Sequence, residues 1–256
     1  MLIEDLQFKS ILPYNKKYNY YVQLESIARY QFALDFLESK GLKDVLDVGC
    51  YNGFGCEIMA RSAESVHGLD INKRYINLAN LYKEKLNLTN TTFERLDVGV
   101  DNMQTDKKFD LITCFDTIAH VDDDKNLIRR IYNRLTDDGY ALISVPCERF
   151  EPMKPDGTSA VVGHKHFYEV TQIKKMFTEA GFEIVDRLGQ ATSNVLLNLE
   201  NFIIRKYDYP ERKVKSYHVY EKENMQYFAR LIAYPNTRDI EDSYSIFLIV
   251  KKAKKQ

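Results

Sequence analysis

The sequence predicts an α/β protein built on a doubly wound, mostly parallel sheet of the Rossmann-like type. Two observations lead to this fold. Short apolar runs alternate with helical patterns along most of the 256 residues, and acidic or other polar residues follow successive runs where each would end. Because the carboxyl ends of parallel strands share one edge, these residues would meet where such sheets bind ligands.

The segment KDVLDVGCYNGFG, residues 43–55, is the first of these strand ends. Its apolar run predicts a buried strand that turns sharply into a helix, and Gly49 and Gly53 permit positive φ and a close approach of ligand to backbone. Asp47 would face a cationic group, so the turn suits a zwitterionic amino-acid head group. A dinucleotide fingerprint would need glycine at Tyr51, and a phosphate loop would need Lys and Ser or Thr after the last glycine.

Composition narrows the class of protein. With 45% hydrophobic and 29% charged residues, the chain can bury the core of one globular domain with an insertion. A net charge of -1 gives no general attraction to nucleic acid. No leader pattern or membrane-length apolar run is present, so we expect a cytoplasmic protein without membrane insertion. The four cysteines lack paired spacing, which favours reduced thiols.

Taken in order, the chain predicts three regions: an N-terminal helical lid over residues 1–41, a core over 42–189 and 241–256, and a helical cap insertion over 190–240, which is too long for a plain loop. The predicted helices cover residues 20–40, 54–63, 75–85, 125–135, 171–180, 194–206 and 223–233. The predicted strands after the first cover residues 65–71, 91–98, 109–115, 140–146, 182–188 and 242–252.

Asp70 ends the second predicted strand, close to the interval of about 20 residues at which an acid after such a turn meets a ribose. An ionised carboxylate only accepts hydrogen bonds, so it can take both vicinal hydroxyl protons. The other interpretation is a turn acid at the start of the next helix, because Asn72 and Lys73 follow. Asp97 stands in the same way at the end of the third strand.

The glycine turn, GLDI, FDLITCFDTIAH, the DDG before the fifth strand and HKHFYEVTQIKKMFTEAGFEI resemble, in this order, class I S-adenosylmethionine-dependent methyltransferases. RYQFALDFL and LGQ are similar to the bacterial group associated with capsule and O-antigen biosynthesis. The resemblance implies a seven-stranded sheet of order 3-2-1-4-5-7-6 with strand 7 antiparallel. It also implies S-adenosyl-L-methionine as cofactor and S-adenosyl-L-homocysteine as product.

The resemblance implies roles for individual residues. Asp97 would accept from the adenine amino group and the backbone of Val98 would donate to the ring. Ala119 stands where an acid sometimes helps to bind a metal, so no metal is expected. The cofactor-binding residues would be Asp47, Gly49, Cys50, Tyr51, Gly53, Asp70, Ile71, Asp97, Val98 and Phe115.

His120 is the first candidate for a general base, with Asp116 as the residue that orients it. The alternative is a histidine held by backbone at the start of the next helix, with His164 or His166 as the base instead. We favour contacts to the acceptor for these two histidines. The alternatives are simple capping of a helix and a metal site, although no third ligand is near them in the sequence. Tyr168 would contact the substrate.

A basic, tyrosine-rich surplus in the cap predicts an anionic acceptor or a solvated face; the residues assigned to substrate binding are Arg212, Lys213 and Lys215. The resulting hypothesis is O-methylation of a phosphorylated or nucleotide-activated precursor of a surface polysaccharide, specifically a methyl phosphoramidate modification of a capsule. The alternatives are an RNA methyltransferase, which the net charge and the lack of an N-P-P-Y-like motif disfavour, and a non-catalytic cofactor-binding scaffold.

Overall fold

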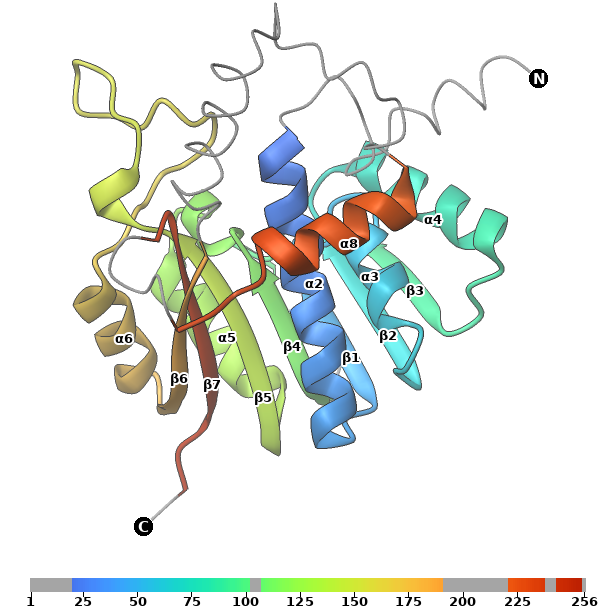
Figure 1. The fold of residues 1–256 in the computed structure, drawn as a ribbon. Coiled ribbons are helices and arrows are strands. Elements are labelled where there is room, and N and C mark those ends of the chain that lie inside the picture. The colour runs from blue at the N-terminus through green and yellow to red at the C-terminus, as the bar shows by residue number, and fades with distance from the viewer. Residues whose placement is uncertain (1–19, 102–106, 191–220, 238–242, 255–256) are drawn as a thin grey trace, which may run out of the picture.

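The structure, a computed structural model, describes residues 20–101, 107–190, 221–237 and 243–254. These residues form a seven-stranded sheet in the order β3-β2-β1-β4-β5-β7-β6, with helices on both faces (Figure 1). Only β7 runs against the other strands, pairing antiparallel with β5 and with β6. The predicted Rossmann-like sheet is therefore confirmed, including its strand order.

The strands are β1 (Asp44–Val48), β2 (Ser65–Asp70), β3 (Thr91–Arg95), β4 (Phe109–Phe115), β5 (Leu135–Pro146), β6 (Phe182–Gln190) and β7 (Ser245–Lys252). The helices are α2 (Tyr20–Lys40), α3 (Phe54–Met59), α4 (Lys73–Leu86), α5 (Asp124–Arg134), α6 (Val170–Glu179) and α8 (Lys222–Ile232), with 3₁₀ turns η1 (Ile118–His120) and η2 (Glu148–Phe150). Most agree with the predicted ranges within two or three residues. The fifth strand is an exception, because β5 begins five residues before the predicted start and includes the DDG that was expected to precede it. The helix predicted over 54–63 ends early, at Met59, and the one predicted over 194–206 lies outside the described residues.

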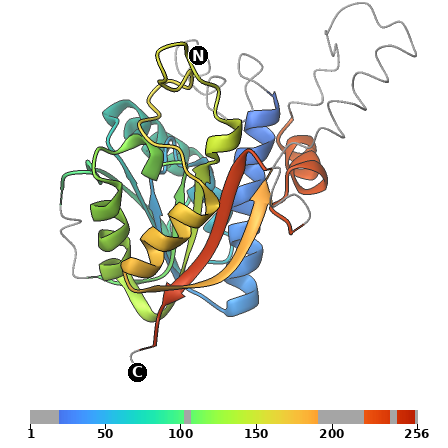
Figure 2. The same ribbon diagram turned by 90° about the vertical axis from the view of Figure 1, so that its left-hand side faces the viewer.

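Two apolar layers cover the sheet. On one face α5 and α6 contribute buried residues such as Ile128 and Phe177. The other face is covered by α2, α3, α4 and α8 (Figures 1 and 2). These helices contribute buried residues such as Leu24, Ile58 and Met225. Because both faces are covered, the central strand β4 is buried along nearly its whole length, as is usual for parallel sheets.

Helix α2, the described part of the predicted lid, packs as a core helix. Leu24, Ile27 and Ala33 on it are fully buried. Helix α8, from the predicted cap, crosses the outer side of α2 (Figure 1), and the Gln31 side chain on α2 donates to the Gln226 carbonyl on α8 at 2.9 Å. Among the described helices, none combines the length and apolarity needed to cross a membrane.

The carboxyl ends of β1 to β5 meet at one edge of the sheet. The long connection after β5, residues 147–169, is tied to this edge because the amides of Lys165 and His166 both donate to the Ala119 carbonyl, at 2.8 and 3.2 Å. Cys147 and Tyr168 close the base of the connection through a β-bridge. The segments predicted to carry the chemistry are thus brought together.

Candidate functional site

The glycine turn after β1 is held by backbone contacts. The amides of Gly49 and Cys50 both donate to the Leu69 carbonyl at 2.8 Å, which joins the turn to the end of β2. Gly49 and Gly53 have φ of +82° and +79°, and a Cβ on Gly49 would lie 2.0 Å from Thr117 Oγ1. Both glycines are therefore required by backbone conformation and by packing. A ligand contact at either one stays a prediction.

Asp47 is fully buried, which differs from the predicted position facing a cationic group. Its carboxylate accepts hydrogen bonds from the hydroxyls of Tyr30 (3.0 Å) and Thr113 (2.7 Å), and the Cys56 thiol lies 3.4 Å away. Burial raises the pKa of Asp47 to about 6, although these hydrogen bonds oppose the shift. The carboxylate thus ties β1 to α2, β4 and α3 from beneath the turn.

Cys50 and Tyr51, which follow Gly49 in the turn, differ in accessibility. The Cys50 side chain is fully buried, so only its backbone can face a ligand. Tyr51 is half-buried, packs its ring 4.1 Å from that of Tyr75, and has a φ of +52°. Positive φ is unusual for a residue other than glycine and is concentrated at functional sites.

Asp70 lies at the end of β2, where its carboxylate accepts from the amides of Tyr51 (3.0 Å) and Asn72 (2.8 Å). Burial raises the pKa of Asp70 against the effect of these two amides. Asn72, not Asp70, caps α4, since its side chain accepts from the Arg74 amide. A carboxylate has about four lone-pair sites, so Asp70 keeps capacity for a diol. Beside it, the apolar side chain of Ile71 is 55% exposed.

Asp97 and Val98 follow β3 at the same edge. One carboxylate oxygen of Asp97 accepts from the Gly99 amide at 3.0 Å. Val98 is buried, and its carbonyl accepts from the guanidinium of Arg130 at 2.8 Å. The structure therefore brings Asp70 and Asp97 to adjacent strand ends, as the sequence predicted, while their ligand contacts stay predictions.

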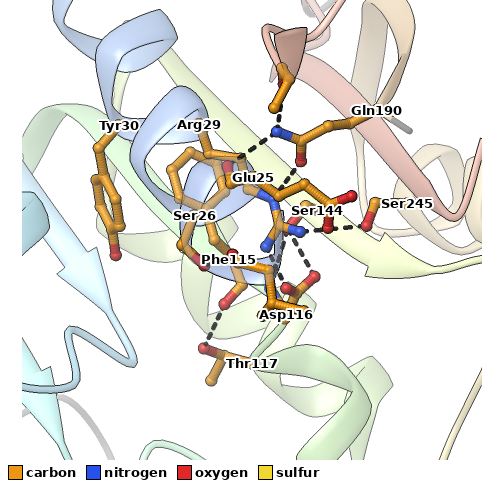
Figure 3. A network of polar contacts seen from close by, with 12 residues as sticks. Glu25, Ser26, Arg29, Tyr30, Phe115, Asp116, Thr117, Ser144, Gln190 and Ser245 are labelled. Atoms are coloured by element: carbon orange, nitrogen blue, oxygen red, sulfur yellow. Dashed lines mark hydrogen bonds and ion pairs between the residues drawn. The ribbon is translucent and has the colours of Figure 1, made fainter. Parts of the chain in front are cut away.

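Asp116, directly after β4, belongs to a network that the sequence did not predict (Figure 3). Its carboxylate accepts from the buried guanidinium of Arg29 and from the Ser144 hydroxyl. Burial opposes ionisation, but Arg29 and Ser144 together hold the pKa of Asp116 below its usual value. Asp116 has a φ of +56°, and its side chain is 37% exposed. Phe115 beside it is buried against Tyr30.

The other side of Arg29 is fixed by Gln190, the last residue of β6. Arg29 Nε donates to the Gln190 side-chain oxygen, and Gln190 in turn donates to the carbonyls of Glu25 (2.9 Å) and Ala233 (2.7 Å) (Figure 3). Ser245 also accepts from Arg29, at 3.2 Å. The patterns RYQFALDFL and LGQ therefore meet in space, because Arg29 opens one and Gln190 closes the other.

The structure corrects the predicted pairing of Asp116 with His120. Asp116 faces Arg29 on α2, whereas His120 is exposed and bonds through Nδ1 to the Gly163 carbonyl at 2.8 Å. The His120 ring instead contacts the ring of His164 edge to face, with centroids 4.9 Å apart. His164 Nδ1 lies 2.8 Å from a carboxylate oxygen of Glu151, so a different acid orients a different histidine.

His166 and Tyr168 have partners outside this cluster. His166 Nε2 bonds to the Val121 carbonyl at 3.0 Å. The structure corrects the assignment of Tyr168 to substrate contact, because its side chain is 1% exposed and its hydroxyl donates to Asp124 at 2.9 Å. Arg212, Lys213 and Lys215 lie outside the described residues. Within the described ranges, no three His, Cys, Asp or Glu side chains are grouped as a metal site.

Sequence reasoning missed Arg29 and Glu151. Arg29 carried a signal, since it is a charge among the apolar positions of the predicted helix over 20–40, and such a charge needs a buried partner. Glu151 stands in an irregular segment rich in charge, Pro and Gly, where no period separates a buried acid from a solvated one.

Comparisons with known proteins agree with this geometry. A family model described as a methyltransferase domain matches residues 17–187. A ubiquinone biosynthesis O-methyltransferase of Acinetobacter baylyi is 26% identical over 160 residues, which span 57% of this chain and 66% of the relative. Phosphoethanolamine N-methyltransferase 3 of Arabidopsis thaliana is 31% identical over 198 residues, spanning 73% of this chain but 40% of the relative.

A solved structure of an S-adenosylmethionine-dependent methyltransferase from Clostridium acetobutylicum shares the fold, with a TM-score of 0.61, 14% identity, and coverage of 88% of this chain and 92% of that one. The family match extends from α2 through most of β6 and includes the ends of β1 to β4 with Asp47, Asp70, Asp97 and Asp116, but it stops before Gln190. The chain belongs to the methyltransferase domain family and has the seven-stranded fold of class I S-adenosylmethionine-dependent methyltransferases.

Proposed function

We propose that the chain is an S-adenosylmethionine-dependent O-methyltransferase whose acceptor is a phosphorylated or nucleotide-activated small molecule. The observation that carries the proposal is the arrangement of one sheet edge: acids end β2 and β3, and a cluster of histidines lies beyond β4 and β5. The first group suits a nucleoside and the second suits proton removal.

The residues present fit the cofactor. Asp70 has lone pairs to accept from ribose hydroxyls, and exposed Ile71 offers an apolar surface for a base. Asp97 at the neighbouring strand end would hold the adenine amino group. When bound, the cofactor supplies a methyl group already activated on a sulfonium, so the protein needs mainly to position the acceptor and remove its proton.

A base distinguishes an oxygen acceptor, because a hydroxyl must lose its proton as it is methylated. His120 and His164 provide two imidazoles in contact at this edge. The Acinetobacter relative is named for O-methylation and the Arabidopsis relative for a phosphorylated substrate, and both features fit this proposal. The basic surplus of residues 205–222 supports an anionic acceptor.

The finer proposal is a place in surface polysaccharide synthesis, with methylation of a phosphoramidate precursor of a capsule. It rests on the resemblance carried by RYQFALDFL and LGQ, whose Arg29 and Gln190 are hydrogen-bonded to each other beside the site. We propose that the reaction takes place in the cytoplasm and needs no metal.

The test is methyl transfer from labelled S-adenosylmethionine to a panel of phosphosugars, nucleotide sugars, phosphoramidates, phosphoethanolamine and RNA. We expect label on an oxygen of an anionic small molecule. Methylation of the phosphoethanolamine nitrogen would overturn the oxygen assignment, and label in RNA would replace the small-molecule acceptor. Cofactor binding without transfer to any acceptor would instead support the scaffold alternative.

A further inference from the structure

Glu151 is a buried carboxylate whose two oxygens differ in hydrogen bonding. Its side chain is fully buried. Oxygen Oε1 accepts from the Ser159 hydroxyl and from His164 Nδ1, whereas Oε2 is buried without a partner in the part of the chain described here. Leaving a buried polar atom unpaired costs about 1 to 3 kcal/mol. Such a carboxylate is expected where its charge has a function.

The contact with Glu151 sets the tautomer of His164. A carboxylate only accepts, so Nδ1 carries the proton and Nε2 of the neutral ring keeps its lone pair. The side chain of His164 is 8% exposed. Its ring contacts His120, whose Nδ1 is held by the uncharged Gly163 carbonyl. The two adjacent imidazoles therefore differ in the group bound at Nδ1, which is a carboxylate for His164 and a backbone carbonyl for His120.

That difference matters when a proton arrives. An imidazole that accepts a proton becomes a cation, and a buried carboxylate on its other nitrogen stabilises this charge more strongly than a carbonyl does. Other charges also act here, since Asp116 interacts electrostatically with His164, and Tyr244 with Glu151. The Glu151 carboxylate thus contacts His164 directly, and the charge of Asp116 also acts on it.

We propose that His164 is the general base of the methyl transfer and that Glu151 is its positioning residue. This inference rests on the proposed function with a hydroxyl as the acceptor group, because an ionised phosphoramidate oxygen carries no proton for a base to remove. The acceptor's proton passes to His164 Nε2. The electron pair of the broken O–H bond forms the new bond to the methyl carbon, while the pair of the broken C–S bond stays on sulfur. The proton then leaves the imidazolium for solvent.

The competing explanation is structural: Glu151 only anchors residues 151–164 through Ser159. Glu151→Gln keeps the size and an accepting oxygen but loses the charge. Ser159→Ala removes the anchoring hydrogen bond and leaves the His164 contact. Lys165→Ala is the matched surface control, because Lys165 is the neighbour of His164 and forms an exposed ion pair with Asp122.

The kinetic test compares kcat and KM in these variants. We expect Glu151→Gln to lower kcat about tenfold to a hundredfold with KM for both substrates nearly unchanged, and to have no further effect when His164 is already Ala. Ser159→Ala and Lys165→Ala should stay close to wild type. An equal loss in Ser159→Ala, or additive losses in Glu151→Gln and His164→Ala, would overturn the proposal.

A second test needs no turnover, and its decisive readout is taken from the wild-type protein. Nitrogen-15 NMR of the wild-type protein should show the neutral His164 ring protonated at Nδ1, and Glu151→Leu should remove that preference. Protonation of wild-type His164 at Nε2 would overturn the pairing. Absence of methyl transfer to every acceptor would contradict the proposed function alone, because the tautomer is measured without substrate.

Discussion

The sheet edge formed by the carboxyl ends of β1 to β5 has two halves, whose polar residues are held in place by different kinds of contact. On the proposed cofactor side, the carboxylates of Asp70 and Asp97 at the ends of β2 and β3 are held by backbone amides of nearby loops. The proposed acceptor side consists of α2 and residues 115–120 and 147–169. There, side chains hold one another across long stretches of sequence, as Arg29 does with Asp116. The cofactor side therefore repeats a local pattern, while the acceptor side depends on the whole fold.

If the acceptor side carries the proton transfer, its histidines give the largest effect. His164→Ala should lower kcat by about 10² to 10⁴ without changing cofactor affinity, because the base is lost. His120→Ala should cost no more than about tenfold, since it removes mainly a ring contact. Steady-state kinetics on both variants checks this order. If His120→Ala shows the larger loss, the proton goes to the ring held by Gly163.

The buried and the exposed ion pair on α2 should contribute differently to the free energy of unfolding. Arg29→Met should lower the free energy of unfolding by about 3 kcal/mol, less than the full effect of breaking a buried pair because Asp116 is partly exposed. The control is Arg230→Met, which breaks the more exposed pair with Asp35 and should cost less than about 1 kcal/mol. Denaturant unfolding measures both.

Adding Asp116→Asn to Arg29→Met sharpens this test. The double variant should recover part of the lost stability, because the asparagine leaves no unpaired charge behind. Equal costs for Arg29→Met and Arg230→Met would mean that the network in Figure 3 does not stabilise the acceptor side.

The cofactor side should respond in binding and not in the proton-transfer step. Asp70→Ala removes hydrogen bonds to a charged acceptor and should weaken S-adenosylmethionine binding by about 1.5 to 3 kcal/mol, roughly tenfold to a hundredfold. Calorimetry checks this, with Glu84→Gln on the exposed side of α4 as control. Unchanged affinity in a folded Asp70→Ala protein would contradict the ribose assignment.

Asp47 predicts the smallest effect, a dependence of stability on pH. Its folded pKa of about 6 lies above the ordinary value, so the folded state binds the proton more tightly, and this contribution is lost as pH rises through 6. Between pH 5 and pH 8 it should remove about 1 kcal/mol of stability. Asp47→Asn should lack this loss. The free energy of unfolding of both proteins is measured across this range. The same dependence on pH in wild type and Asp47→Asn would contradict a folded pKa of about 6 for Asp47.

The success of sequence reasoning follows the same division. Strand ends and their acids were predictable, because Asp70 and Asp97 are marked by the local apolar runs before them. The partners of Asp116 were not, since Arg29 precedes it by 87 residues and no spacing rule connects two side chains across a sheet. The strand-end position of Asp116 was correct, and the inferred bond to His120 was wrong for this reason.

Buried and exposed residues of one segment also cannot be separated where the chain has no period. In residues 147–169, Glu151 is buried while Arg149 and Phe150 before it are exposed. Tyr168 was assigned to the substrate from its neighbourhood in the sequence, yet it lies in the core. Helical or strand spacing would have indicated a buried face, and this connection has neither.

A crystal structure of the complex with S-adenosyl-L-homocysteine tests the central claim most directly, since it shows whether the two halves of the edge bind one reaction centre. We predict ribose hydroxyls about 2.5 to 3.0 Å from the Asp70 carboxylate, the adenine beside Ile71 and Asp97, and the sulfur directed toward His164. A ribose held away from Asp70, or a sulfur directed away from His120 and His164, would contradict this account.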